Sequence, residues 1–231
     1  GFVVSLLCQM GIMVVFALSY NMLLGQTGLL SFGHAVYYGL GAFVSMHALN
    51  LFGKDGGPLA VALLPLAGGL AGLLAGVVLG YVTTKKAGTT FAMISLGIGE
   101  LVAACALMFP GFFGGEGGVS GNRVVGKGNL LGFTWGPQIE MYWLIVAWAF
   151  LATVAMFALT QTPLGRMANA VRDNPERAEF VGYDTQRVRY LMLILSGFFA
   201  GIAGGLTALN YEIVTAETLN AHTSGVVLLM T

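Results

Sequence analysis

The stretch TPLGRMANAVRDNPERAEFVGYDTQRVRY, residues 162–190, holds nine of the twenty Asp, Glu, Lys and Arg residues in a chain of 231. Hydrophobic residues make up 57% of the chain and charged residues only 9%, whereas a soluble domain has about 25% charged residues. This composition predicts a membrane protein. We call residues 162–190 the polar island, and we expect it to lie in water between two segments that cross the bilayer.

The apolar stretches around the polar island are long enough for about six transmembrane helices, because a helix needs about 20 residues to cross the hydrocarbon core. We expect an all-α, polytopic membrane protein with a single transmembrane domain over residues 1–231. The chain begins and stops inside apolar runs, so we expect it to be truncated at both ends. The expected spans cover residues 2–24, 34–52, 59–83, 87–109, 141–161 and 190–209, and the start of another follows.

Basic residues indicate the side of the membrane that each connection faces, because cytoplasmic loops are enriched in Lys and Arg. The polar island carries five arginines, the largest basic count of any connection, and is expected to be cytoplasmic. Lys85 and Lys86 end the third span, and two spans separate them from the polar island. Both basic markers therefore fall on one side of the membrane.

Residues 1–53 contain no Asp, Glu, Lys or Arg and are too long for one span. The sequence GQTGLLSFGH, at 25–34, is the only candidate for a break. We expect residues 25–33 to form either a tight turn or an unwound segment at membrane depth. The second alternative requires that the freed backbone groups be buried in protein or face a water-filled cavity.

Helix signals within the polar island predict a short, broken helix at the membrane surface. Thr162 and Pro163 have the residue types of an N-cap and a first helical position. Asn174 and Pro175 restart the helix, and Gly182 is suited to end it. Acidic residues alternate with the arginines, which membrane topology alone does not require. A protein docking surface is therefore favoured over a loop that is charged only for topology.

Polar groups in the spans are few, so we expect no catalytic site and no metal or cofactor site in this chain. A formal net charge of zero also gives no indication of nucleic-acid binding. Glu100 lies near the centre of the fourth span, where an ionised side chain costs about 2.5–3.5 kcal/mol. It is expected either to line a substrate path or to be a hydrogen-bonded packing group between helices.

Three polar residues at the break are further candidates for the path. Ser31 and His34 could pair with Glu100 or line the same cavity, and Gln26 lies in the break itself. For His34 the favoured interpretation is a side chain that caps freed backbone groups.

Two motifs resemble the inner-membrane permeases of branched-chain amino acid ABC importers, the LivM and LivH family. NMLLGQTGLLSFGHAVYYGLG at 21–41 is similar to the family's early Gly-Gln-x-Gly-x-x-Ser-x-Gly-x-Ala pattern, and AVRDNPERAEFVGY at 170–183 resembles its coupling-loop signature. GGEGGVSG at 114–121 and GFFAGIAGGL at 197–206 are also similar to family segments. The resemblance covers most of the chain and favours the LivM-like branch, although family permeases are longer.

The resemblance implies a permease subunit of an ABC importer in the bacterial inner membrane, and not an enzyme. Such an importer moves branched-chain or related hydrophobic amino acids into the cytoplasm, and the family's substrates extend to urea and amides. The implied partners are the lipid bilayer, a second permease, two ATP-binding subunits that hold ATP and Mg²⁺, and a periplasmic substrate-binding protein. The candidate residues for coupling to the ATP-binding subunits are Arg166, Arg172, Asp173, Asn174, Pro175, Glu176, Arg177, Glu179 and Gly182.

The residues alone leave two other functions possible. An ion-coupled secondary transporter or channel would use Glu100 and His34 to carry protons, and the polar island would then be incidental. A membrane scaffold would dock a partner on the polar island without any transport. Dependence on ATP separates the importer from the first alternative, and movement of substrate separates it from the second.

Overall fold

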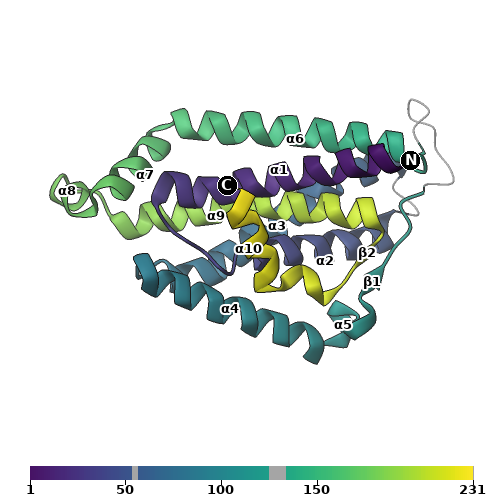
Figure 1. The fold of residues 1–231 in the computed structure, drawn as a ribbon, viewed down its shortest axis with the longest axis horizontal. Helices are drawn as coiled ribbons and strands as arrows, with labels where there is room; N and C mark the ends of the chain where they lie inside the picture. The colour runs from purple at the N-terminus through teal and green to yellow at the C-terminus, as the bar shows by residue number, and fades with distance from the viewer. Residues whose placement is uncertain (54–56, 125–133, 231) are drawn as a thin grey trace.

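The computed structural model describes residues 1–53, 57–124 and 134–230 as a bundle of long helices that run in similar directions (Figure 1). Six of the described helices are long and apolar enough to cross a membrane. The prediction of an all-α, polytopic membrane fold is therefore confirmed. These helices are α1 (Phe2–Thr27), α2 (Ala35–Phe52), α3 (Gly57–Thr83), α4 (Gly88–Met108), α6 (Gln138–Gln161) and α9 (Thr185–Tyr211).

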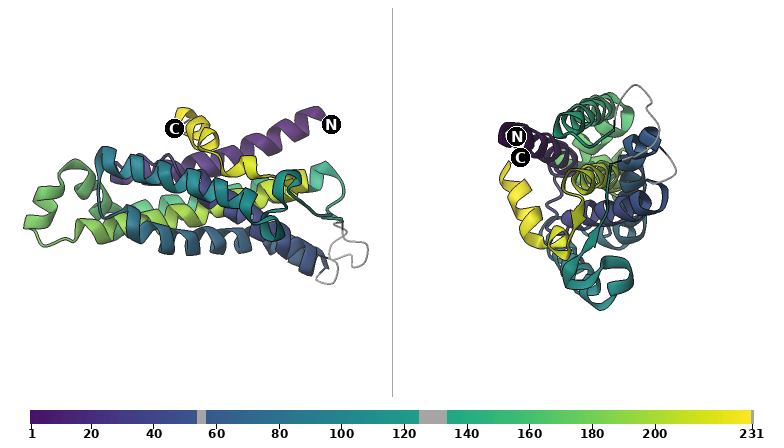
Figure 2. Two further views of the ribbon diagram at one scale, coloured as in Figure 1. Left: turned by 90° about the horizontal axis from the view of Figure 1, so that it is seen from below. Right: turned by 90° about the vertical axis from the view of Figure 1, so that its right-hand side faces the viewer.

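Short elements lie at both ends of the bundle. At one end α7 (Pro163–Asp173) and α8 (Pro175–Phe180) extend beyond the long helices (Figures 1 and 2). The link between α3 and α4, which carries Lys85 and Lys86, lies at this same end, as the basic markers predict. The opposite end holds α5 (Pro110–Phe113), the 3₁₀-helix η1 (Gly115–Gly117), and the antiparallel strands β1 (Val119–Ser120) and β2 (Ile213–Val214).

Two of the long helices are followed by segments that turn back into the bundle. After α1, residues 28–34 run back as non-helical chain, and α2 begins well inside the bundle (Figure 1). After α9, β2 and the 3₁₀-helix η2 (Ala216–Leu219) lead to α10 (Ala221–Met230), the start of a further apolar segment. The first turns of α2 and α10 meet, because the Ala35 N–H donates to Ser224 Oγ at 2.8 Å.

Helix α9 is the centre of the bundle, and 78% of the residues in its apolar stretch are buried. Glycines let neighbouring backbones approach it closely, as is common between membrane helices. A Cβ atom on Gly204 would lie only 1.9 Å from the Tyr38 carbonyl oxygen in α2, and one on Gly72 in α3 would lie 2.1 Å from the Gly197 carbonyl oxygen. Helix α9, which follows the polar island, is therefore packed closely against α2 and α3, which precede it.

Candidate functional site

Side-chain caps divide the polar island into two short helices. Thr162 Oγ1 accepts a hydrogen bond from the Gly165 N–H at 3.4 Å, and Pro163 is the first residue of α7. Asn174 Oδ1 accepts one from the Arg177 N–H at 2.9 Å at the start of α8. The predicted caps at Thr162 and Asn174 are confirmed, and both bonds hold the chain in a defined shape.

The end of α8 is tied to the start of α9. Gly182 has a φ of 98°, a left-handed conformation that glycine adopts without strain, and it follows Val181, the C-cap of α8. Asp184 Oδ1 then caps α9 by accepting from the Arg187 N–H at 3.1 Å. Thr185 Oγ1 donates to Glu179 Oε1 at 2.8 Å, so a side chain of α8 is bonded to the first residue of α9. A side-chain hydrogen bond therefore joins α8 to α9 in addition to the chain between them.

The inner face of α7 is buried at Gly165, Ala168 and Val171. Beside this face, Arg172 Nη1 donates to the carbonyl oxygen of Gly25 in the last turn of α1. Arg172, a candidate docking residue, therefore points back to the bundle and bonds to the helix that leads into the break.

The outer part of the polar island is exposed and mixes charge with apolar groups. Phe180 is 90% exposed and Val181 75% exposed, although both are large hydrophobic residues. Arg166, Glu176 and Arg177 are exposed as well. An aromatic side chain among charges, at a tip beyond the bundle, has the composition of a protein-binding anchor. Phe180 was not among the sequence candidates, because its burial could not be read from the pattern.

Non-helical backbone between α1 and α2 bonds both to the end of α1 and to α4. The Phe32 N–H donates to Ser95 Oγ of α4 at 3.1 Å. Gly33 lies against the same helix, where a Cβ atom would be 2.2 Å from the Ser95 carbonyl oxygen. Helix α1 runs to Thr27, so the break begins at residue 28 and not at 25. Residues 28–34 are an unwound segment and not a tight turn, and the Phe32 N–H finds its partner within the protein.

His34 is fully buried where the unwound segment meets α1 and α9. Its Nε2 lies 3.2 Å from Ser19 Oγ in α1 and 3.5 Å from Ser196 Oγ in α9. The ring stacks on Phe16 with centroids 5.6 Å apart and meets Tyr20 edge-on at 5.3 Å. The capping interpretation is wrong, because His34 makes no side-chain cap bond although it occupies the N-cap position of α2. It links three helices through its side chain instead.

Glu100 is exposed on the outer face of α4. Among the described residues, no hydrogen bond or ion pair joins it to His34 or to the buried Ser31, so a pairing, the first of the two alternatives, is not observed, and a place on the substrate path stays a prediction. The physical reason is helical geometry: a Cβ atom on Gly99 would lie 3.4 Å from Gly33 Cα, so position 99 faces the unwound segment, and the next residue points about 100° away. A carboxyl group at this position faces outward from the bundle.

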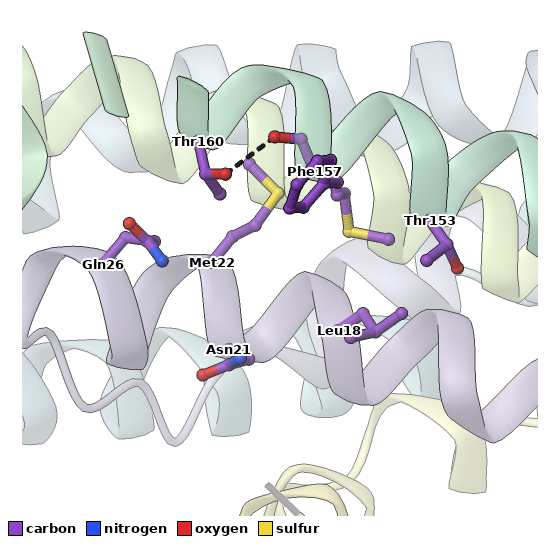
Figure 3. Close-up of a pocket in the computed structure, with 8 residues that line it drawn as sticks. Leu18, Asn21, Met22, Gln26, Thr153, Phe157 and Thr160 are labelled. Carbon is purple, nitrogen blue, oxygen red and sulfur yellow. Dashed lines mark hydrogen bonds between the residues drawn. The ribbon is translucent and has the colours of Figure 1, made fainter. Parts of the chain in front are cut away.

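A groove of about 210 Å³ lies between α1 and α6, next to the end that carries α7 (Figure 3). Gln26 and Met22 point from α1 toward α6, and Thr160 and Phe157 point from α6 toward α1. Gln26 Oε1 is buried and has no hydrogen-bond partner among the described residues. Of the four predicted path residues, Gln26 is thus the one that faces a cavity here. The groove is lined by Leu18, Asn21, Met22, Gln26, Thr153, Met156, Phe157 and Thr160.

Sequence reasoning also missed a structural role for Arg123 at the opposite end. This side chain is 6% exposed, and its Nη1 donates to the carbonyl oxygens of Leu209 at 2.8 Å and Asn210 at 2.9 Å. A cation at the C-terminal end of α9 is favourable because the helix dipole is negative there. The carbonyl partners lie far away in sequence, so no local pattern could have revealed the contact.

Replacing Arg123 with glutamine is expected to lower the free energy of unfolding by about 2 kcal/mol, since buried carbonyl groups lose charged donors. Thermal unfolding in detergent measures this loss. The exposed Arg166 is the matched control, and Arg166→Gln should leave the unfolding temperature unchanged. An unchanged unfolding temperature for Arg123→Gln would contradict the structural role.

Comparison with known proteins identifies similar chains over almost the whole length. A family model described as branched-chain amino acid transport system, permease component, matches residues 2–230. The high-affinity branched-chain amino acid transport system permease protein LivM of Escherichia coli is 27% identical over 94% of this chain and 55% of its own length. The chain therefore spans about half the length of that relative.

Two further relatives bear on the substrate. The probable branched-chain amino acid transport permease protein LivH of Methanocaldococcus jannaschii is 26% identical over 89% of this chain and 65% of its own length. The guanosine ABC transporter permease protein NupQ of Bacillus subtilis is 30% identical, but over only 30% of this chain and 22% of its own length. No solved structure matches this chain.

Proposed function

The chain belongs to the family of permease components of branched-chain amino acid transport systems, and from this premise we propose that it is the permease subunit of an ATP-driven importer. The polar island is the observation that carries this proposal. It is a capped, two-piece helix beyond the end of the bundle, with Phe180 exposed at its tip. Such a shape suits the transmission of force from a soluble partner to membrane helices.

We propose that the polar island is on the cytoplasmic side of the bacterial inner membrane. Its five arginines support this orientation, and so does the position of Lys85 and Lys86 at the same end of the bundle. Import would then run from the end that carries β1 and β2 toward the end that carries α7 and α8.

The proposed partners are a second permease subunit, two ATP-binding subunits that hold ATP and Mg²⁺, and an external substrate-binding protein. Closure of the ATP-binding subunits would displace α7 and α8. Because α7 follows α6 and α8 is bonded to α9 through Glu179 and Thr185, the displacement would reach both helices. A rigid-body shift of this kind can open one face of a bundle and close the other.

Branched-chain or related hydrophobic amino acids are the proposed substrates. The relatives named for branched-chain amino acids align with about nine-tenths of this chain, whereas the guanosine permease aligns with less than a third. The groove beside Gln26 is mostly apolar with a few amide and hydroxyl groups, a lining that suits an aliphatic side chain. An ion-coupled carrier is the less favoured candidate, because Glu100 and His34 are not joined by a hydrogen bond within the described residues.

Uptake of labelled leucine tests the proposal directly. The full-length chain and its partner subunits are reconstituted in liposomes, with the binding protein and leucine on one side and ATP on the other. Accumulation should require ATP hydrolysis and should continue in the presence of a protonophore. Accumulation that a protonophore abolishes and ATP does not support would contradict an ATP-driven importer.

A further inference from the structure

We infer that Arg172 is a positioning residue that makes the end of α1 and the unwound segment 28–34 follow the motion of the polar island. The inference rests on the proposed function, because it concerns how force enters the membrane helices. It assigns Arg172 to transmission inside this chain, and not to docking of the ATP-binding subunits.

Helix α1 is not adjacent to the polar island in the sequence. The chain enters the polar island from α6 and leaves it through α9, so these two helices follow its displacement directly. The bond from Arg172 Nη1 to the Gly25 carbonyl oxygen supplies a third attachment. Gly25 lies in the last turn of α1, where the negative end of the helix dipole strengthens the attraction to a guanidinium group.

The side chain of Arg172 is held in this direction from both sides. Asp173 Oδ1 accepts a hydrogen bond from Arg172 Nε at 3.0 Å. On the other side, Gly28 ends α1 with a φ of 69°, and a Cβ atom there would lie 3.0 Å from Arg172 Cγ. Gly28 therefore leaves room for the stem of Arg172 to cross the end of α1.

Other arginines of the polar island do not make this connection. Among the described residues, the side chains of Arg166 and Arg177 make no hydrogen bond to a transmembrane helix. Arg187 pairs with Asp184 at 2.9 Å within the polar island itself, and Arg189 Nε is buried with no hydrogen-bond partner there. In the part of the chain that the structure describes, Arg172 is the arginine of the polar island with a hydrogen bond to another transmembrane helix. A general need for positive charge would not single out this one position.

The segments beyond Gly25 are those that connect to the interior of the bundle. Gln26, the next residue, faces the groove between α1 and α6. The unwound segment then carries Gly33 against α4 and His34 against Ser19 and Ser196. Without Arg172, the end of α1 would follow the polar island only through apolar packing and through the contact of His34 with Ser196 in α9, so hydrolysis would be less tightly coupled to opening of the path.

The decisive quantity is the number of substrate molecules moved per ATP hydrolysed by the assembled full-length transporter. Arg172→Ala should lower this ratio about 10- to 100-fold, the range for losing a charge-assisted hydrogen bond, while the ATPase rate of the complex is largely retained. Arg172→Lys should restore part of the ratio, because lysine keeps the charge near the end of α1 but cannot bond to Gly25 and Asp173 together.

Arg177→Ala is the matched control, since Arg177 is exposed and, among the described residues, its side chain makes no hydrogen bond to α1. It should lower uptake and ATPase rate in the same proportion and leave their ratio unchanged. The ratio of substrate moved to ATP hydrolysed does not depend on how much of the protein is folded, so it can be measured on a partly unfolded variant. If Arg172→Ala cannot be purified, the ratio is measured on Arg172→Lys.

An unchanged ratio in the Arg172 variants, with uptake and ATPase rate falling together, would overturn the inference and identify Arg172 as a docking contact. Unchanged uptake would overturn it too. Failure of the proposed function has a different signature, because the unaltered transporter would then show no ATP-driven uptake at all.

Discussion

Phe180→Asp is expected to lower ATP-driven uptake at least about 100-fold, because truncating a central aromatic anchor costs 2 kcal/mol or more and a buried carboxylate adds to that cost. Phe180 is 90% exposed in the isolated chain, so its side chain stabilises nothing within the bundle. The variant should therefore insert and fold normally. Uptake, ATPase rate and co-purification of the ATP-binding subunits are the measurements, and all should fall together.

Gln186→Asp is the matched control for Phe180→Asp. Gln186 is also exposed and also belongs to the polar island, but it lies in the first turn of α9 and not at the tip. This variant should retain uptake. Equal loss in the two variants would show that any added negative charge in the polar island is harmful, and full uptake by Phe180→Asp would remove Phe180 from the docking surface.

Gly33→Ala is expected to destabilise the fold by about 3 kcal/mol and to abolish uptake, because overpacking against an immobile backbone atom cannot relax. The new Cβ atom would lie 2.2 Å from the Ser95 carbonyl oxygen, so the unwound segment would have to leave α4. The hydrogen bond from the Phe32 N–H to Ser95 Oγ would be lost with it. Thermal unfolding and leucine uptake measure the two effects.

Gly97→Ala provides the control for Gly33→Ala. Gly97 lies in α4 near the same region, but nothing lies within 4 Å of the position of its Cβ atom. Alanine favours helix over glycine by about 1 kcal/mol, so this variant should be as stable as the unaltered chain or slightly more stable. If Gly33→Ala were as stable as Gly97→Ala, the close contact of the unwound segment with α4 would be ruled out.

Local signals in the sequence were sufficient for the spans and for the shape of the polar island. Apolar runs fix where helices can cross a membrane, and caps such as Thr162, Asn174 and Asp184 act within three residues of their own position. The sixth span begins at Thr185 and not near residue 190, because the cap at Asp184 starts the helix ahead of the apolar run.

Long-range contacts could not be predicted from local sequence patterns. The course of the unwound segment depends on Ser95 and Ser224, which lie 63 and 189 residues from their partners. The direction of Arg172 depends on Gly25, 147 residues away. The face of α4 that Glu100 occupies was also beyond local reasoning, because a difference of one residue on a helix changes the face, and an apolar span gives little indication of which face is buried.

Cross-linking from position 180 tests the central claim, that the polar island couples this chain to ATP-binding subunits. A photoreactive amino acid replaces Phe180 in the full-length chain, and the assembled transporter is irradiated in native membranes. The adduct is predicted to contain an ATP-binding subunit, and its yield should change when ATP is added. An adduct with an external binding protein, or none with any ATP-binding subunit, would contradict the account.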